Sequence, residues 1–247
     1  MIDTHAHLDA CAEPAAVLVA RAREAGVTRV ITIGTDLASC RRALELADEH
    51  EGVYAVLGIH PHEAGVVDPE DVEKLRGLLA QPKAIGVGET GLDFYRDYAP
   101  RDAQRRLFER QLGVAADLGK PVVIHTRAAD EETLGGLAGF TGTVVLHCFS
   151  SPALLEPALE RGWYISFAGN VTYKNAHDLR SAAYAVPAER LLVETDSPYL
   201  APDPRRGRPN EPANVVHIVV ALARARNADA AGLAAQIDAN AARCFGL

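Results

Sequence analysis

The run Pro121-Val122-Val123-Ile124-His125 shows the pattern that decides the fold: a short apolar segment that ends in a histidine. Arg29-Val30-Ile31-Thr32-Ile33 is almost as apolar. Continuous apolar runs of this length are typical of parallel strands that are buried on both faces. The predicted strands are Ile2–His5, Val27–Ile33, Val53–Ile59, Ala84–Glu89, Pro121–His125, Thr143–His147, Tyr164–Phe167 and Leu191–Thr195.

The segments between these strands have helical spacing. In Arg101–Leu118, residues such as Leu107 and Leu112 fall on one apolar stripe, and Gly119 follows in the position of a C-terminal cap. Pro14–Ala25 ends before a glycine in the same way. Eight strand–helix units in a chain of 247 residues predict an α/β fold, a (β/α)₈ TIM barrel.

An open, doubly wound sheet is the alternative fold. Such a sheet usually carries a glycine-rich turn after its first strand, whereas this chain has Ala6-His7-Leu8-Asp9 there. No linker, repeat or low-complexity segment interrupts the pattern, and the proline-rich run Ser197–Pro212 is expected to be a long loop. We therefore expect a single barrel domain over residues 1–247.

The composition limits the compartment and the partners. A formal net charge of −8 without a basic tail argues against a protein that coats long DNA, so any contact with nucleic acid is expected to be local. No run of about 18 apolar residues predicts a membrane span, and a candidate ligand at residue 5 leaves no room for a cleavable signal peptide. Four widely spaced cysteines predict reduced thiols in a cytoplasmic protein, and no obligate protein partner is evident.

Histidines gather at the carboxyl ends of the predicted strands, the face on which barrel active sites are built. Strand side chains alternate, so two histidines separated by one residue share a face. Six of the nine histidines lie at such ends, and they are His5, His7, His60, His62, His125 and His147. Glu89 and Asp196 lie at the ends of two further strands. Because random placement would scatter these side chains, the sequence predicts a metal centre.

The number of candidate ligands predicts two metal ions. Four histidines and two carboxylates exceed the three protein ligands typical of one open catalytic zinc site. The predicted ligands are His5, His7, Glu89, His125, His147 and Asp196. No lysine lies at the end of the fourth or fifth strand, so Glu89 is expected to bridge the ions. The proposed division places His5, His7 and Asp196 on one ion, and His125 and His147 on the other.

A series of motifs resembles those of the TatD-type metal-dependent deoxyribonucleases, which belong to the amidohydrolase-type barrels. The motifs run in order from residue 2 to the last residue, and they are Asp3–Asp9, Gly58-Ile59-His60-Pro61-His62, Gly86–Asp93, Val123–Arg127, Leu146–Ser150, Gly169–Lys174, Glu194–Tyr199, Asn210-Glu211-Pro212 and Asn240–Leu247. The resemblance implies a Mg²⁺-dependent nuclease with 3′→5′ exonuclease action on DNA, single strands or 3′ ends, and the same six ligands. Thr126 in place of a commoner serine, and Pro209 in place of a frequent basic residue, depart from the pattern.

The expected chemistry is metal-assisted hydrolysis of a phosphodiester. Asp196 is expected to accept the proton of the attacking water, and Glu89 to hold the metal pair. Glu194, two residues before Asp196, faces the same lumen and is expected to hydrogen-bond a histidine ligand. A ligand set rich in histidine favours Zn²⁺ or Mn²⁺, whereas Mg²⁺ prefers oxygen ligands, so the identity of the metal stays open.

Cations on the same face are suited to phosphate, because a guanidinium matches its geometry. The predicted substrate-binding residues are His60, His62, Arg127, Lys174, Arg206 and Arg208. Tyr95, Phe149 and Tyr173 are candidates for stacking a base, with loop packing as the alternative for each.

Two other functions stay open. An amide, lactone or phosphotriester hydrolase would use the same binuclear centre, but the cationic loops and the Glu89 bridge favour a phosphodiester. A non-enzymatic module that binds metal or nucleic acid does not explain why a candidate general base, Asp196, accompanies a full ligand set.

Overall fold

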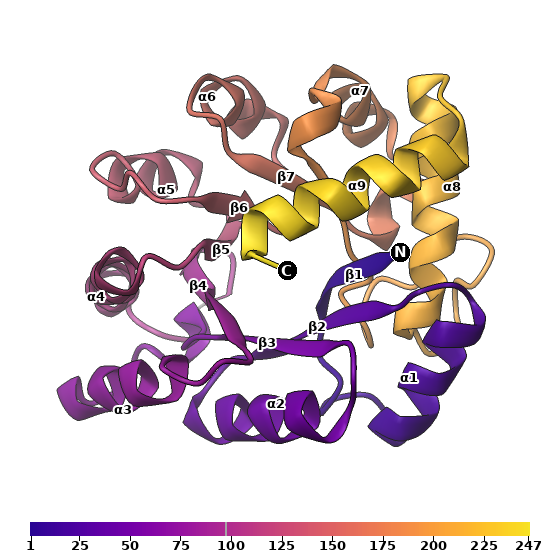
Figure 1. The fold of residues 1–247 in the computed structure, drawn as a ribbon. Helices are drawn as coiled ribbons and strands as arrows, with labels where there is room; N and C mark the ends of the chain where they lie inside the picture. Colours follow the sequence, from indigo (N-terminus) through magenta and orange to yellow (C-terminus); the bar gives the residue numbers. More distant parts are fainter. Residues whose placement is uncertain (97) are drawn as a thin grey trace.

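A computed structural model describes residues 1–96 and 98–247 of the chain. Within these residues, eight parallel strands form one sheet in the order β1 to β8 (Figure 1). The strands are β1 (Ile2–Ala6), β2 (Arg29–Gly34), β3 (Val53–Leu57), β4 (Ala84–Asp93), β5 (Val122–Arg127), β6 (Val144–Leu146), β7 (Tyr164–Phe167) and β8 (Leu191–Val193). All eight lie within a few residues of the predicted segments.

The residues after β8 close the sheet against β1. The backbone N–H of Asp196 donates to the His5 carbonyl at 2.9 Å, and that of His7 donates to the Ser197 carbonyl at 2.7 Å. The sheet is therefore a nearly closed barrel. The predicted TIM barrel is confirmed, and the open doubly wound sheet is excluded.

Helices surround the barrel (Figure 1). They are α1 (Ala15–Glu24), α2 (Leu37–Glu49), α3 (Pro69–Leu79), α4 (Arg101–Leu118), α5 (Asp130–Gly136), α6 (Leu155–Glu160), α7 (His177–Ala185), α8 (Val215–Arg226) and α9 (Ala230–Phe245). The bounds of α4 are those predicted, and Gly119 ends it with a left-handed φ of 62°. Throughout residues 1–96 and 98–247, no helix combines the length and the apolar character needed to cross a bilayer.

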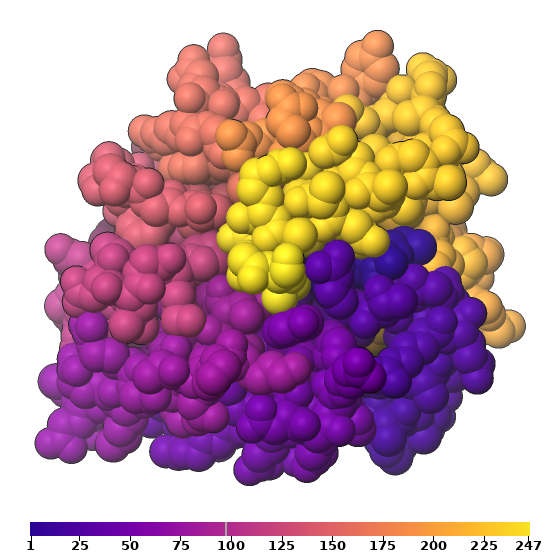
Figure 2. Space-filling view, in the orientation of Figure 1, coloured from indigo at the N-terminus to yellow at the C-terminus, as the bar shows by residue number. Residues whose placement is uncertain are grey.

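The amino ends of the strands are closed by α9. Its buried residues Ala241, Cys244 and Phe245 pack in one cluster with lumen side chains such as Ile2 and Leu192. Figures 1 and 2 show this helix running across the middle of the barrel face. Asn240 fastens the helix to β8, because its side-chain amide donates to the Leu191 carbonyl at 2.8 Å. The polar site must therefore lie at the opposite end of the lumen.

Strand β4 differs from its prediction. It was expected to end at Glu89 but continues to Asp93. Its pairing with β5 shifts between Val87 and Thr90, so that three steps along β4 oppose two along β5. This is the geometry of a bulge, which re-aims the side chain at that point. Gly88 makes it possible: its φ of 151° is one that other residues rarely adopt, and a Cβ there would lie 2.6 Å from the Val123 carbonyl oxygen.

Candidate metal centre

Glu89 lies at the centre of the polar cluster, and its two carboxylate oxygens face different histidines. Oε1 lies 2.7 Å from His125 Nδ1, 2.9 Å from His147 Nε2 and 3.4 Å from His60 Nε2. Oε2 lies 3.5 Å from His5 Nε2 and 3.8 Å from His7 Nε2. A carboxylate that faces two sets of donors has the geometry of a bridging ligand.

Asp196 completes the second set. Its Oδ1 lies 3.5 Å from His7 Nε2 and 3.9 Å from His5 Nε2, and the two imidazole nitrogens are 3.3 Å apart. The His5 ring also stacks on His147, with 4.1 Å between the ring centroids. All six ligands predicted from the sequence therefore converge at one end of the lumen.

The donor set fits divalent metal ions. Three overlapping groups each place their ligand atoms within 4.8 Å of one another: His5 with His7 and Asp196, His5 with Glu89 and His147, and His60 with Glu89 and His125. Imidazole nitrogens and carboxylate oxygens are common ligands of Zn²⁺ and Mn²⁺. The third group contains His60, which the sequence reading assigned to the substrate, so the geometry also admits His60 as a ligand.

The charges of the cluster support each other. Burial alone would raise the pKa of Glu89, but the adjacent His147 and His60 hold it well below its ordinary value. Burial would likewise lower the pKa of His147, but Glu89 and Glu194 hold it well above its ordinary value. Glu89 is therefore held in the ionised form that a metal ligand requires, and a bound cation would replace the proton on His147.

Glu194 lies against the edge of the His147 ring that is opposite Glu89. Its Oε1 lies 3.1 Å from His147 Nδ1 and accepts the backbone N–H of Cys148 at 2.6 Å. Its Oε2 accepts the Ser166 hydroxyl at 2.5 Å. The Nε2 of His147 is therefore turned toward Glu89, the arrangement in which an outer carboxylate orients a metal-binding histidine.

Asp93 orients the ring of His125 in the same way that Glu194 orients His147. The sequence did not predict this contact. Its Oδ2 lies 3.3 Å from His125 Nε2 and 2.9 Å from His62 Nε2. Burial raises the pKa of Asp93, but hydrogen bonds from His125, the Arg96 backbone and His62 outweigh it and lower the pKa. One signal was available: Asp93 is the last residue of the motif Gly86–Asp93, although the strand itself was expected to end at Glu89.

Asp196 lies beyond β8 and not within a strand, in a left-handed backbone conformation with φ of 54°. The buried Asp3 fixes the preceding residue, because it accepts the backbone N–H of Thr195 at 2.8 Å and the Thr195 hydroxyl at 2.5 Å. Non-glycine residues in this conformation are strained and cluster at functional sites. Asp3 on β1 and Thr195 after β8 thus fix the backbone that positions the Asp196 carboxylate.

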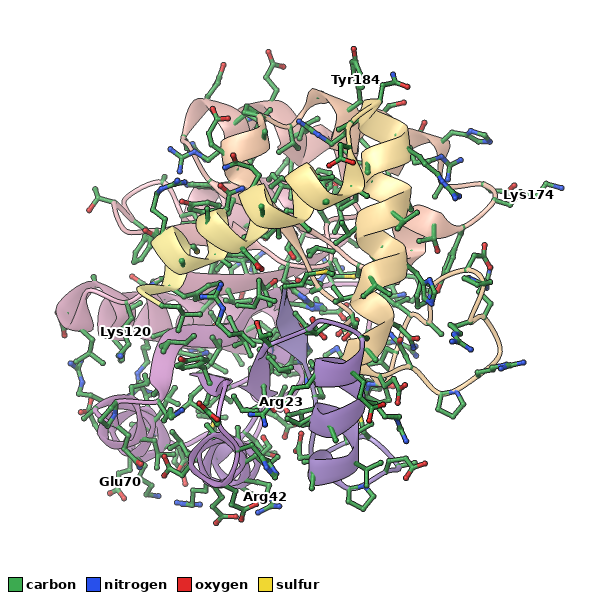
Figure 3. The ribbon with its side chains drawn as sticks, turned by 45° about the vertical axis from the view of Figure 1, so that its right-hand side comes forward. Arg23, Arg42, Glu70, Lys120, Lys174 and Tyr184 are labelled. Atoms are coloured by element: carbon green, nitrogen blue, oxygen red, sulfur yellow. The ribbon has the colours of Figure 1, made fainter. Side chains whose placement is uncertain are left out.

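The predicted substrate contacts divide into two groups. His62 lies beside the cluster through Asp93, and Arg127 lies over the ring of Tyr95, 4.0 Å from its centroid. Lys174 and Arg208 are exposed, and Figure 3 shows Lys174 extending outward from its loop. Within the described part of the chain, neither of these two makes a contact with the histidine cluster.

The aromatic candidates also differ. For Phe149 the structure favours packing, the alternative to base stacking, because its ring is 2% exposed and packs edge-on against Phe167 with 5.7 Å between centroids. Tyr173 is covered by Arg206, 3.9 Å from the ring centroid. Burial raises the pKa of Tyr173 above its ordinary value, and the Arg206 charge offsets part of this rise. Arg206 lies in the loop that follows β8, and this loop leaves the barrel at the carboxyl ends of the strands, where the histidine cluster lies.

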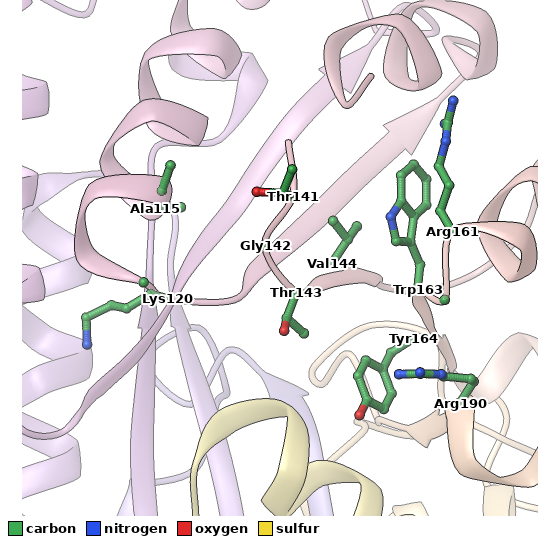
Figure 4. A pocket seen from close by; sticks show the side chains of 13 residues that line it. Ala115, Lys120, Thr141, Gly142, Thr143, Val144, Arg161, Trp163, Tyr164 and Arg190 are labelled. Atoms are coloured by element: carbon green, nitrogen blue, oxygen red, sulfur yellow. The ribbon is translucent and has the colours of Figure 1, made fainter. Parts of the chain in front are cut away.

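A separate hollow lies at the other end of the barrel. A cavity of about 360 Å³ is lined by residues at the amino ends of β5 to β8, among them Lys120, Thr143, Trp163 and Arg190 (Figure 4). The histidine cluster lies at the carboxyl ends of the same strands, so this cavity is not part of it.

Comparisons with known proteins agree with the geometry. The family model described as "TatD related DNase" matches residues 2–246. A Mycobacterium tuberculosis protein named "Uncharacterized metal-dependent hydrolase TatD" is 40% identical, with 100% of this chain and 98% of that protein covered. A Klebsiella pneumoniae protein named "3'-5' ssDNA/RNA exonuclease TatD" is 37% identical over 93% of this chain and 91% of its own. The crystal structure of the TatD homologue YJJV from Escherichia coli superposes with a TM-score of 0.94, at 29% identity and coverage of 100% and 98%.

The barrel and its buried cluster of histidines and carboxylates define a metal-dependent hydrolase. With the family match over nearly the whole sequence, the chain belongs to the TatD family.

Proposed function

We propose that this protein is a binuclear, divalent-metal-dependent exonuclease that removes nucleotides from the 3′ ends of DNA, preferentially from single strands. The observation that carries the proposal is the division of Glu89: one oxygen faces His125 and His147, and the other faces His5 and His7. The substrate rests on similarity, since relatives 37% identical are named 3'-5' ssDNA/RNA exonucleases.

The proposed ligands of the two ions are the six predicted residues. His5, His7 and Asp196 would hold one ion, His125 and His147 would hold the other, and Glu89 would be shared between them. Divalent ions bound there would acidify a water and polarise a phosphate oxygen. Zn²⁺ and Mn²⁺ suit the histidines, and Mg²⁺ is the ion that the family resemblance implies.

The side chains have distinct proposed roles in the reaction. The Asp196 carboxylate, with its side chain 13% exposed, accepts the proton of the attacking water. His62 has the more open side chain of the nearby pair, 26% exposed against 12% for His60. We assign His62 to the scissile phosphate, with Asp93 fixing its ring. Arg127 and Arg206 bind phosphates further along the strand.

The four cysteines are free thiols, which fits the reducing interior of a cell. We propose the cytoplasm as the compartment.

The test is a nuclease assay on protein stripped of metal and reloaded with Mg²⁺, Mn²⁺ or Zn²⁺, with bound metal measured in the same samples. An oligonucleotide labelled at its 5′ end should shorten one nucleotide at a time, and Asp196→Asn should be inactive even at metal concentrations that restore its metal content to that of wild type. An intact oligonucleotide with fully loaded protein would overturn the proposal. Turnover of a lactone panel with the DNA left intact would favour the alternative hydrolase.

A further inference from the structure

Aromatic rings and guanidinium groups alternate in a row that leads away from the metal centre. The Tyr98 ring meets the His62 ring edge-on, with 4.8 Å between centroids. The Arg96 guanidinium carbon lies 5.9 Å from the ring centroid of Tyr98 and 5.9 Å from that of Tyr95. The Arg127 guanidinium lies 4.0 Å from the Tyr95 centroid. We call Tyr95, Arg96, Tyr98 and Arg127 the aromatic ladder.

The ladder is attached to the metal centre through Asp93. While Oδ2 of this carboxylate faces His62 and His125, its Oδ1 accepts the backbone N–H groups of Tyr95 at 3.0 Å and Arg96 at 2.9 Å. The buried Gln104 side chain accepts the Asp93 N–H at 2.9 Å and donates to the Ala99 carbonyl at 3.0 Å. The backbone at Tyr95 and Arg96 is therefore held in place by the same carboxylate that faces the histidines, which lowers the entropy cost of binding.

The rings of the ladder are open to solvent. Tyr95 is 65% exposed and Tyr98 is 64% exposed. A third tyrosine, Tyr199, is 57% exposed and lies edge-on to His7, with 5.8 Å between centroids. Exposed aromatic surface gathered around a site marks an interaction surface.

A cavity of about 280 Å³ lies beside the ladder, with walls that include Asp93, Phe94, Arg96 and Arg101. The Arg101 guanidinium lies over the Phe94 ring, 4.5 Å from its centroid. Two arginines at one hollow suit a phosphate group, which the planar guanidinium binds through paired hydrogen bonds. Rings for bases and cations for the backbone thus occur side by side.

We propose that the aromatic ladder is a base-stacking subsite, which binds the unpaired nucleobases next to the scissile phosphate on the exposed rings of Tyr95 and Tyr98. This inference rests on the proposed nuclease function and adds that the enzyme recognises the unpaired bases of its substrate. Stacking on aromatic rings tolerates every base but requires that the base be unpaired. The subsite therefore selects single-stranded ends without a sequence preference.

Tyrosine substitutions test the subsite. Tyr95→Ala and Tyr98→Ala should each raise KM for a single-stranded oligonucleotide roughly 5- to 150-fold, the scale of one lost base–aromatic stack, with a smaller change in kcat. Tyr95→Phe and Tyr98→Phe keep the ring and should restore the wild-type KM. Tyr184→Ala is the matched control, because Tyr184 is 63% exposed on α7 and lies outside the ladder. A KM for both alanine variants within twofold of wild type would overturn the proposal.

A change in the substrate separates stacking from a general structural effect. An oligonucleotide with abasic residues at its last three positions should be a poorer substrate for the wild-type enzyme by a similar factor in KM. With Tyr95→Ala or Tyr98→Ala, the KM for this abasic oligonucleotide should not rise above its wild-type value, because the base and the ring are the two partners of one contact. Losses that multiply would place the bases elsewhere and contradict the proposal.

Binding without turnover distinguishes this inference from the proposed function. A single strand that carries 2-aminopurine near its 3′ end should change its fluorescence on mixing with metal-free protein, and the change should be lost in Tyr95→Ala and Tyr98→Ala. If the loaded protein leaves DNA intact while this signal is present, the nuclease proposal fails and the subsite stands. Cleavage of DNA with an unchanged signal in the variants overturns the subsite alone.

Discussion

The two ends of the barrel are built from the same strands and carry opposite chemistry. Three lumen side chains toward the amino ends are apolar and belong to the cluster under α9, and the side chains two positions later are polar and lie in or beside the metal centre. The apolar residues are Val123, Val145 and Leu192, and the polar residues are His125, His147 and Glu194. On each of these strands, the apolar core and the candidate metal site are therefore separated by only two residues, the interval at which side chains return to the same face.

This contrast explains how the fold tolerates so many buried charges. Desolvation of Glu89 and His147 is unfavourable unless each is paired with an opposite charge. The closed end, with Phe245 and its neighbours buried, contributes apolar stabilisation that the polar end does not. If the two ends are independent, substitutions should affect stability at one end and metal chemistry at the other.

The largest effect is expected at the polar end, from Glu89→Gln. This change removes the negative charge that faces both sets of histidines, so one bound ion per chain should be lost. We expect kcat/KM to fall at least about 10³-fold, more than the roughly 10- to 100-fold loss typical of an outer partner. Metal content and nuclease rate would be measured together, with circular dichroism to verify the fold. A variant that keeps two ions and a rate within tenfold of wild type would refute the bridging role.

The second effect is expected at the closed end, from Phe245→Ala. Removing this ring leaves a cavity under the barrel and should lower the free energy of unfolding by about 3 kcal/mol. The rate per folded molecule should stay unchanged, because the site lies at the other end of the lumen. Urea denaturation and assays at low temperature would measure the two quantities. Val220→Ala, at a residue 39% exposed on α8, is the control. A reduced rate in the folded fraction would show that the ends are coupled.

The third effect returns to the polar end, with Glu194→Gln. The amide keeps the shape of the side chain and its contact with the Cys148 N–H but removes the charge beside His147. Metal affinity, measured by competition with a chelator, should fall about 10- to 100-fold. The matched change Glu189→Gln at an exposed glutamate should leave it unaltered. Equal affinities for the two variants would show that Glu194 does not orient the ligand.

The difference between the ends also explains what the sequence could predict. Apolar runs ending in histidine specified the strands, because burial on both faces leaves little choice of residue type. The same reasoning brought His5, His147 and Asp196 to one face, because parallel strands share a carboxyl edge. These features depend on alternation alone.

The contacts that alternation could not predict depend on irregular backbone. The bulge in β4 and its extension to Asp93 place that carboxylate between His62 and His125. The turn after β3 brings His60 to Glu89. The ring of Phe149 packs inward against Phe167, although its position in the chain directly follows a site loop. Such contacts join segments that no local pattern relates, so they required the structure.

The smallest effect, and the sharpest test of independence, is expected from Asn240→Ala. The Asn240 amide donates to the Ala188 carbonyl at 2.7 Å and to the Leu191 carbonyl at 2.8 Å, and it thereby ties α9 to the start of β8. Loss of these bonds should lower the free energy of unfolding by about 1–2 kcal/mol. Amide hydrogen exchange should quicken in α9, whereas Gln81→Ala at an exposed turn should change neither quantity.

Because β8 leads directly into Glu194 and Asp196, any transmission between the ends would follow this strand. If the metal affinity of Asn240→Ala is unchanged, α9 stabilises the barrel but does not orient the candidate ligands. If the affinity falls as much as in Glu194→Gln, the orientation of Asp196 depends on the packing of α9.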